Sequence, residues 1–307
     1  MTQGGPQYFE EMTLLRAVAV ISVVAIHTTA TFPDMLSRGL LYNSIYVLNS
    51  LVGFAVPLFI FISGFVLYNK YPTVTNLKSF YYKRMLTVVI PYIIFHLIGR
   101  VFGSFYHLWF LTLIAELYII YPFIIEIYSY SKKINMTIGL VLSSFIISLI
   151  VNHWPIPITI PIAFLFLPYL LLGVLIRDNY DKVKEVLLKL PVYTPIAIIP
   201  VLGLRMIDTS TIMTPIYCSV APLICLSLVI GKESRVLSLI GKKSFGIYLV
   251  HVPILAIIVT MLSLNGITID TWFYYPISIV IIVTLSIILV QLVQKIPYGQ
   301  YIIGNNR

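Results

Sequence analysis

Two ionisable residues, Arg16 and His27, stand inside the first apolar stretch of the chain, LLRAVAVISVVAIHTTATF. Ionisable side chains are costly at membrane depth, so they usually face a protein interior or a water-filled path and are candidates for function. Eleven residues make three helical turns, which points both side chains within roughly 20° of each other and sets them about 16 Å apart along the axis. That is half of the ~30 Å hydrocarbon core, so we expect one residue near each membrane face.

The imidazole of His27 is suited to take a proton from a hydroxyl, because its unperturbed pKa of about 6.5 leaves it mostly neutral at physiological pH. Two alternatives remain open. His27 could be an interfacial histidine that bonds a helix carbonyl, and Arg16 could extend its guanidinium to the inner headgroups. The shared helix face favours the catalytic interpretation.

A second charged group, Glu116, lies near the middle of the apolar stretch HLWFLTLIAELYIIYP. A carboxylate at that depth requires a partner, for which His27, Arg100 and a polar ligand are candidates. It would then orient a histidine tautomer in catalysis or, alternatively, fix helix register through an ion pair. Arg100 and His107 are predicted to form a polar cluster with His27 at the outer membrane face, unless they are interfacial anchors.

Basic residues at the other end of these stretches suit a phosphate-bearing ligand. Lys83 and Arg84 in YYKRMLTVVIPY would stand at the inner mouth of a span. Ordinary positive charge on cytoplasmic segments is the alternative explanation. The chain has no Walker A, GxGxxG or GxSxG motif and no Cys/His spacing typical of a metal site. His251 is interpreted as a histidine bonded within the helix bundle, and Gly64 as a close-packing position.

The composition indicates an integral membrane protein. Hydrophobic residues make up 59% of the 307 residues and charged residues only 10%, against about 25% in soluble domains. The net charge of +9 is spread between apolar runs, which favours a topological role over nucleic-acid binding. We predict an all-α fold of ten transmembrane helices, near residues 12–31, 46–68, 85–103, 107–128, 134–151, 157–176, 190–205, 211–230, 244–264 and 272–294.

The placement of positive charges supports this count. With a cytoplasmic N-terminus, 16 of the 20 Lys and Arg residues fall on inner segments, and only Arg38 and Arg205 fall on outer ones. Both termini are therefore predicted to be cytoplasmic. The run at 190–205 is the least typical span, being short and holding three prolines. The connections are short and no internal repeat is visible, so we expect one membrane domain over residues 1–307 and disfavour a secondary carrier.

Four stretches in order, RAVAVISVVAIH, PLFIFISGFVLY, HLWFL and KKSFGIYLVHVPI, resemble the membrane acyltransferase 3 family. The resemblance implies transfer of an acyl group, acetyl most often, from cytoplasmic acyl-CoA to a hydroxyl of a surface or lipid-linked glycan, in a bacterial cytoplasmic membrane. The family's Arg-to-His signature maps onto Arg16 and His27. Its arginine pattern at the third-helix entrance maps onto Arg84, but Thr87 stands where a second arginine is often found.

These expectations combine into one hypothesis. Acyl-CoA would place its phosphates on Arg84 and Lys83, pass its pantetheine arm along Arg16 and bring the thioester to His27, with Glu116 as the orienting carboxylate. His27 would act as general base or would relay the acyl group. The acceptor would be a glycan or a separate acyl-accepting protein, and a homodimer is possible. The competing hypotheses are an exporter of polysaccharide and a structural subunit of a polymer-synthesis complex.

Overall fold

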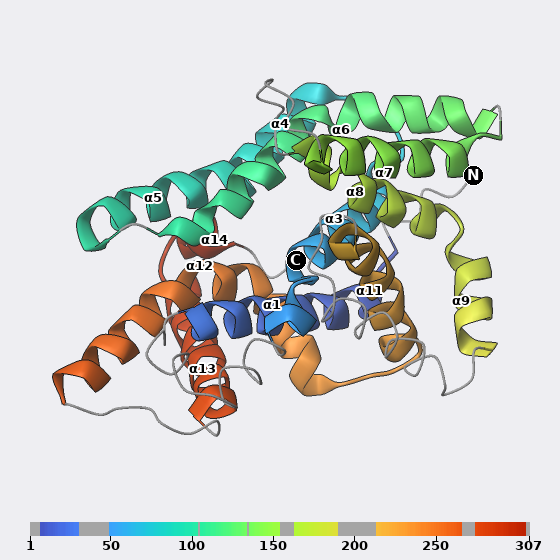
Figure 1. Cartoon of the computed structure of the whole chain (residues 1–307). Helices are drawn as coiled ribbons and strands as arrows, with labels where there is room; N and C mark the ends of the chain where they lie inside the picture. The colour runs from blue at the N-terminus through green and yellow to red at the C-terminus, as the bar shows by residue number, and fades with distance from the viewer. Residues whose placement is uncertain are drawn as a thin grey trace.

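The computed structural model describes residues 7–30, 49–103, 105–133, 135–153, 163–189, 213–265 and 274–304. The described chain is helical throughout, as predicted (Figure 1). In order, its helices are α1 (Glu10–Ala30), α3 (Ala55–Lys70), α4 (Leu77–Arg84), a π-helix η2 (Met85–Val89), α5 (Ile90–Phe102), a 3-10 turn η3 (Tyr106–Leu108), α6 (Trp109–Lys133), α7 (Thr137–His153), α8 (Ala163–Asp178), α9 (Tyr180–Lys189), α11 (Met213–Val229), α12 (Arg235–Leu264), α13 (Tyr274–Lys295) and α14 (Gly299–Ile303).

Within the described residues, six helical segments are long and apolar enough to cross a membrane. They contain α1, α3, the continuous run of α4, η2 and α5, and then α6, α12 and α13. A seventh is present if α8 and α9, which meet at a bend of 88°, count as one span, and α7 and α11 are shorter apolar helices. The chain is thus a multi-pass membrane protein. The predicted span 190–205 lies outside the described residues, and the count of ten and the cytoplasmic termini stay predictions.

Two helix pairs run parallel, in the relative directions that the predicted topology requires. α12 lies along α1, with Gly241 beside Thr13 at one end and His251 beside His27 at the other. α8 lies along α3 in the same way: Gly64 faces Leu170, and Tyr68 reaches Asp178. We call the end that holds His27 the histidine end and the end that holds Asp178 the aspartate end.

The described residues on either side of the gap at 190–212 lie at opposite ends of the bundle. Leu188 of α9 lies against Gly231, just past the end of α11. At the start of α11, the Tyr217 hydroxyl donates a hydrogen bond to the carbonyl of Leu51, which precedes α3.

Glycines let three helices approach backbone to backbone. A Cβ on Gly64 of α3 would stand 2.1 Å from the Leu170 carbonyl oxygen, and one on Gly173 of α8 would stand 2.0 Å from that of Phe61. A Cβ on Gly241 of α12 would stand 1.9 Å from the Thr13 carbonyl oxygen. Small residues are the usual means of close helix packing in membranes. The predicted packing role of Gly64 is therefore confirmed.

Two helices begin earlier than the hydropathy predicts. α12 begins at Arg235, after Ser234 accepts a hydrogen bond from the Leu237 amide, rather than at residue 244. The third span is continuous with α4 from Leu77, rather than beginning at 85. Lysine and arginine favour helix nearly as much as leucine does, so charge ends the apolar run without ending the helix.

Candidate active site

Helix α1 carries both predicted residues on one uninterrupted helix, so the spacing of Arg16 and His27 holds in the structure. Its flanks are covered by α3, α12, α13 and α11. Most of its side chains are buried, whereas Arg16 and His27 are only partly buried. The helix therefore lies in the interior of the bundle and leaves two polar groups accessible, about 16 Å apart along its axis.

At the histidine end, three imidazoles from three helical segments converge. The ring of His27 lies 5.1 Å from that of His251 in α12 and 6.1 Å from that of His107 in η3, and His107 and His251 are 5.1 Å apart, measured between ring centres. We call these residues the histidine cluster. Tyr106 borders it, with its hydroxyl 3.3 Å from Nδ1 of His27. The predicted meeting of His107 with His27 is confirmed.

The tautomer of His251 is set by its own helix. Its Nδ1 lies 2.7 Å from the carbonyl oxygen of Tyr248, which only accepts, so Nδ1 carries the proton and donates it. The neutral ring then has an unprotonated Nε2. That nitrogen is buried and has no hydrogen-bond partner among the described residues, and the same holds for both ring nitrogens of His107.

Such unsatisfied groups are rare in folded proteins, since each costs roughly 1–3 kcal/mol. His251 is 0% exposed and His107 is 1% exposed, so bulk water does not reach the two rings. The Tyr248 hydroxyl donates a hydrogen bond to the His107 carbonyl, which holds η3 against α12. The two buried histidines are therefore held rigidly and present free ring nitrogens, as a site for a polar reactant would.

Nearer the aspartate end, two arginines share one tyrosine of α6. The Arg84 guanidinium lies over the rings of Tyr71, Phe80 and Tyr118, at 5.3, 5.0 and 4.9 Å from their centres. Tyr118 also lies within electrostatic range of Arg16 in α1. We call Arg16 and Arg84 the arginine pair.

The arginine pair has no acidic partner in the described part of the chain. The ion pairs there join other residues, Lys132 with Asp178, Lys184 with Glu11 and Lys189 with Glu185. Nε of Arg84 is buried without a hydrogen-bond partner. Lys83, by contrast, is exposed, and its carbonyl accepts a hydrogen bond from the Thr87 hydroxyl. Two partly buried cations without an acidic partner among the described residues are suited to hold an anion.

Glu116 lies away from the histidine cluster. Its Oε2 accepts a hydrogen bond from the backbone amide of Ala163, the first residue of α8, at 3.1 Å. A carboxylate at a helix N-terminus satisfies a free amide and interacts favourably with the helix dipole. Glu116 is nine residues from His107 along α6, about 13 Å of helix. The structure therefore does not support the predicted contact of Glu116 with His27.

Sequence reasoning missed two members of the site. His251 was predicted to be a histidine bonded within the helix bundle; its Nδ1 does bond the Tyr248 carbonyl, but its ring also packs against His27. Tyr118 was not singled out, although it follows His107 by eleven residues, the interval that separates Arg16 from His27. Arg100 does not join the histidine cluster and lines a separate pocket. Among the described residues, no group of three His, Cys, Asp or Glu is arranged to hold a metal.

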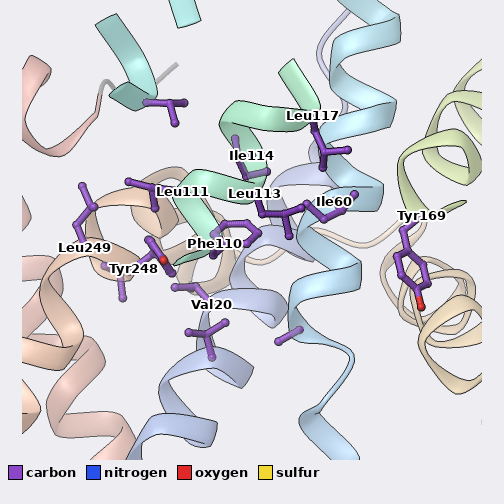
Figure 2. Close-up of a cluster of buried hydrophobic side chains, with 14 of the residues drawn as sticks. Val20, Ile60, Phe110, Leu111, Leu113, Ile114, Leu117, Tyr169, Tyr248 and Leu249 are labelled. Carbon is purple, nitrogen blue, oxygen red and sulfur yellow. The ribbon is translucent and has the colours of Figure 1, made fainter. Parts of the chain in front are cut away.

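Apolar side chains occupy the region between the arginine pair and the histidine cluster. Figure 2 shows Phe110 and Leu113 of α6 beside Val20 of α1, with Ile60 of α3 next to them. All four are buried. A reactant that passes between the two polar groups would thus travel through a dry environment, which strengthens electrostatic interactions and keeps water from a reactive intermediate.

Comparison with known protein families agrees with this arrangement. The family model described as an acyltransferase domain, Acyl_transf_3, matches residues 9–291. Comparisons with curated proteins and with solved structures found no match. The matched region runs from the residue before α1 into α13 and contains the histidine cluster and the arginine pair. The chain therefore belongs to the acyltransferase 3 family.

Proposed function

We propose that this protein is a membrane O-acyltransferase that moves an acyl group, acetyl first of all, from cytoplasmic acyl-CoA to a hydroxyl of an extracytoplasmic or lipid-linked glycan. One observation carries the proposal. Helix α1 contributes Arg16 to a pair of arginines without acidic partners in the described chain, and it contributes His27, three turns away, to a histidine cluster in which buried ring nitrogens have no hydrogen-bond partner among the described residues. These are the groups that a phosphate-bearing donor and a hydroxyl acceptor need.

The arginine pair would hold the donor. Guanidinium groups bind phosphates through two parallel hydrogen bonds, and the aromatic rings around Arg84 fix its plane. The exposed Lys83 adds a solvent-screened charge at the entrance. An extended pantetheine arm is of the same order of length as the separation of about 16 Å between Arg16 and His27. The thioester of a donor bound in this way would reach the histidine cluster along the apolar region.

His27 would act as general base in a single displacement. Its imidazole takes the proton of the acceptor hydroxyl as the oxygen attacks the thioester carbonyl carbon. The tetrahedral intermediate collapses, the C–S bond breaks, and the CoA thiolate takes the proton from the His27 imidazolium. The products are the acyl ester and CoA-SH, and His27 returns to its neutral form. Direct displacement avoids an acyl-imidazole that water could hydrolyse.

His251, rather than Glu116, would position the base. Its Nε2 accepts hydrogen bonds only, and its ring packs against that of His27. An N–H of His27, or the reacting hydroxyl, is the donor that this nitrogen needs. His107 encloses the same space from η3. Proton transfer by a positioned side chain contributes about 10²–10⁴-fold in rate.

The first test measures turnover of acetyl-CoA labelled on its acetyl group, with protein purified in detergent. We compare the wild type with His27→Gln, which keeps a polar side chain but has no basic nitrogen. The variant should lose at least about 10²-fold in turnover while it still binds acetyl-CoA. Full turnover by His27→Gln would exclude the general-base role. Absence of acyl-CoA binding by the wild type would reject the acyltransferase in favour of an exporter or a structural subunit.

A second test concerns the donor end and uses two neighbouring cations as a matched pair. Arg84→Gln should raise the KM for acetyl-CoA about tenfold or more, because it removes a partly buried cation without a competing acid. Lys83→Gln should raise it less than about threefold, because an exposed charge is screened by salt. Equal effects of the two variants would show that the site recognises only the general positive charge of this surface.

A further inference from the structure

A pocket lined by aromatic rings and one arginine lies beside the histidine cluster, between α5 and the start of α6. Its volume is about 410 Å³, within the range of small-molecule sites. One wall is formed by Tyr92, His96 and Arg100, which follow one another at intervals of four residues and so share one face of α5. The facing wall includes Phe105, Trp109 and Thr112.

The pocket presents one cation and several aromatic rings. Arg100 is exposed, and its guanidinium has no hydrogen-bond or ion-pair partner in the described segments. The His96 ring is stacked on Tyr92, with ring centres 5.6 Å apart and planes at 22°. Trp109 is 42% exposed. Aromatic faces pack against the C–H groups of a sugar ring, and a guanidinium binds a carboxylate or a phosphate.

The pocket and the histidine cluster share a single wall. In the segment from Phe105 to Trp109, Phe105, Leu108 and Trp109 line the pocket, whereas Tyr106 and His107 touch His27. The rings of Phe105 and His107 are 6.0 Å apart. Tyr106 is 57% exposed, and its hydroxyl lies 3.3 Å from Nδ1 of His27. A ligand in the pocket is therefore about one side chain away from the proposed base.

We propose that this pocket binds the acceptor through a sugar unit that carries a negative charge, a carboxylate or a phosphate ester. Arg100 would bind the charged group, and Trp109 would pack against the ring, so that a neighbouring hydroxyl passes Tyr106 to reach His27. The proposal rests on the proposed acyl transfer, and it specifies that the acceptor is negatively charged. It makes Arg100 a specificity residue that does not touch the donor.

The test measures binding and transfer separately, with D-glucose, D-glucuronate and D-glucose 6-phosphate, which differ only at C6. Binding is followed by saturation-transfer NMR on protein in nanodiscs of phosphatidylcholine. We expect the wild type to bind one or both charged sugars at least about tenfold more tightly than glucose. Arg100→Gln should abolish this preference and Arg100→Lys should keep part of it. Arg235→Gln, an exposed arginine at the start of α12, is the matched control and should keep it fully.

Equal binding of the three sugars would overturn the proposal, and so would a preference for charged sugars that survives Arg100→Gln. Loss of sugar binding when phosphatidylglycerol is added would also overturn it, because it would identify the pocket as a lipid-headgroup site. Turnover of labelled acetyl-CoA is measured in the same preparations. If charged sugars bind but the wild type never turns over acetyl-CoA, the pocket stands and the acyltransferase proposal fails. If acetyl-CoA is turned over but Arg100 has no influence on sugar binding, the acyltransferase proposal stands and the pocket proposal fails.

Discussion

At the scale of single residues, the site is defined by polar atoms that have no partner. His107 and His251 are buried with free nitrogens, and Arg84 has a buried Nε that bonds to nothing in the described chain. Buried groups of this kind lower the stability of a fold unless something else satisfies them. Six such side-chain atoms occur in the described chain, and four of them belong to Arg84 and to the histidine cluster, where the spacing of Arg16 and His27 directs a donor and an acceptor; the other two are the Tyr180 hydroxyl and Ser286 Oγ. Glu116, by contrast, has a structural partner at the start of α8.

One residue-scale prediction separates the packing of His251 from its chemistry. His251→Phe keeps an aromatic ring in a fully buried place but removes the free nitrogen. If Nε2 positions His27 or the reacting hydroxyl, turnover of acetyl-CoA by the variant should fall at least about tenfold, and the pH profile of turnover should change shape. The melting temperature of the variant should stay within a few degrees of that of the wild type. The measurements are turnover against pH and thermal unfolding in detergent. A stable His251→Phe variant with the wild-type pH profile would show that the ring serves packing only.

At the scale of helices, the position of the site depends on close contacts between backbones. α12 can bring His251 to His27 because Gly241 lets it lie against α1, and α8 can present its N-terminus to Glu116 while Gly64 and Gly173 hold it against α3. Side chains at these glycines would separate the helix axes. Reacting groups tolerate little displacement, since about 1 Å of misplacement can cost 10²-fold in rate.

The element-scale prediction compares two glycines within helices. Gly173→Ala places a methyl group 2.0 Å from the Phe61 carbonyl oxygen, so α3 and α8 must separate, and we expect a loss of about 1–3 kcal/mol in stability. Gly139→Ala in α7 meets no atom within 4 Å and should be neutral or stabilising by roughly 0.5–1 kcal/mol. Thermal unfolding of both variants in the same detergent checks this. Equal melting temperatures would show that the close contact contributes nothing.

At the scale of the whole molecule, the two polar levels lie toward opposite ends of the bundle. The histidine cluster and the Arg100 pocket belong to one end of the bundle, and the Lys132–Asp178 ion pair to the other. The predicted topology, which rests on the distribution of positive charges, places the second end in the cytoplasm. A donor from the cytoplasm and an acceptor from outside would then meet inside the bundle without either crossing the membrane.

The topology can be checked by cysteine labelling. After Cys218 and Cys225 are replaced by alanine, Lys232→Cys and Asn265→Cys each introduce one thiol, near the two ends of α12. Both positions are exposed. With an impermeant maleimide, Asn265→Cys should react in intact cells and Lys232→Cys only after the membrane is opened. The opposite pattern would invert the assignment of donor and acceptor sides, and labelling of both in intact cells would contradict a crossing by α12.

The features that depend on local geometry and composition could be predicted from the sequence. The apolar runs predict a helical membrane protein, and the eleven-residue interval places Arg16 and His27 on one face of α1, because helix periodicity needs no information about neighbours. Packing between helices decided the rest. It brought His251 and His107 to His27, directed Glu116 to Ala163 and placed Arg100 in its own pocket. Glu116 and Ala163 are 47 residues apart in the sequence, and the three histidines are separated by longer intervals. Periodicity along one helix does not predict which faces of distant helices will meet.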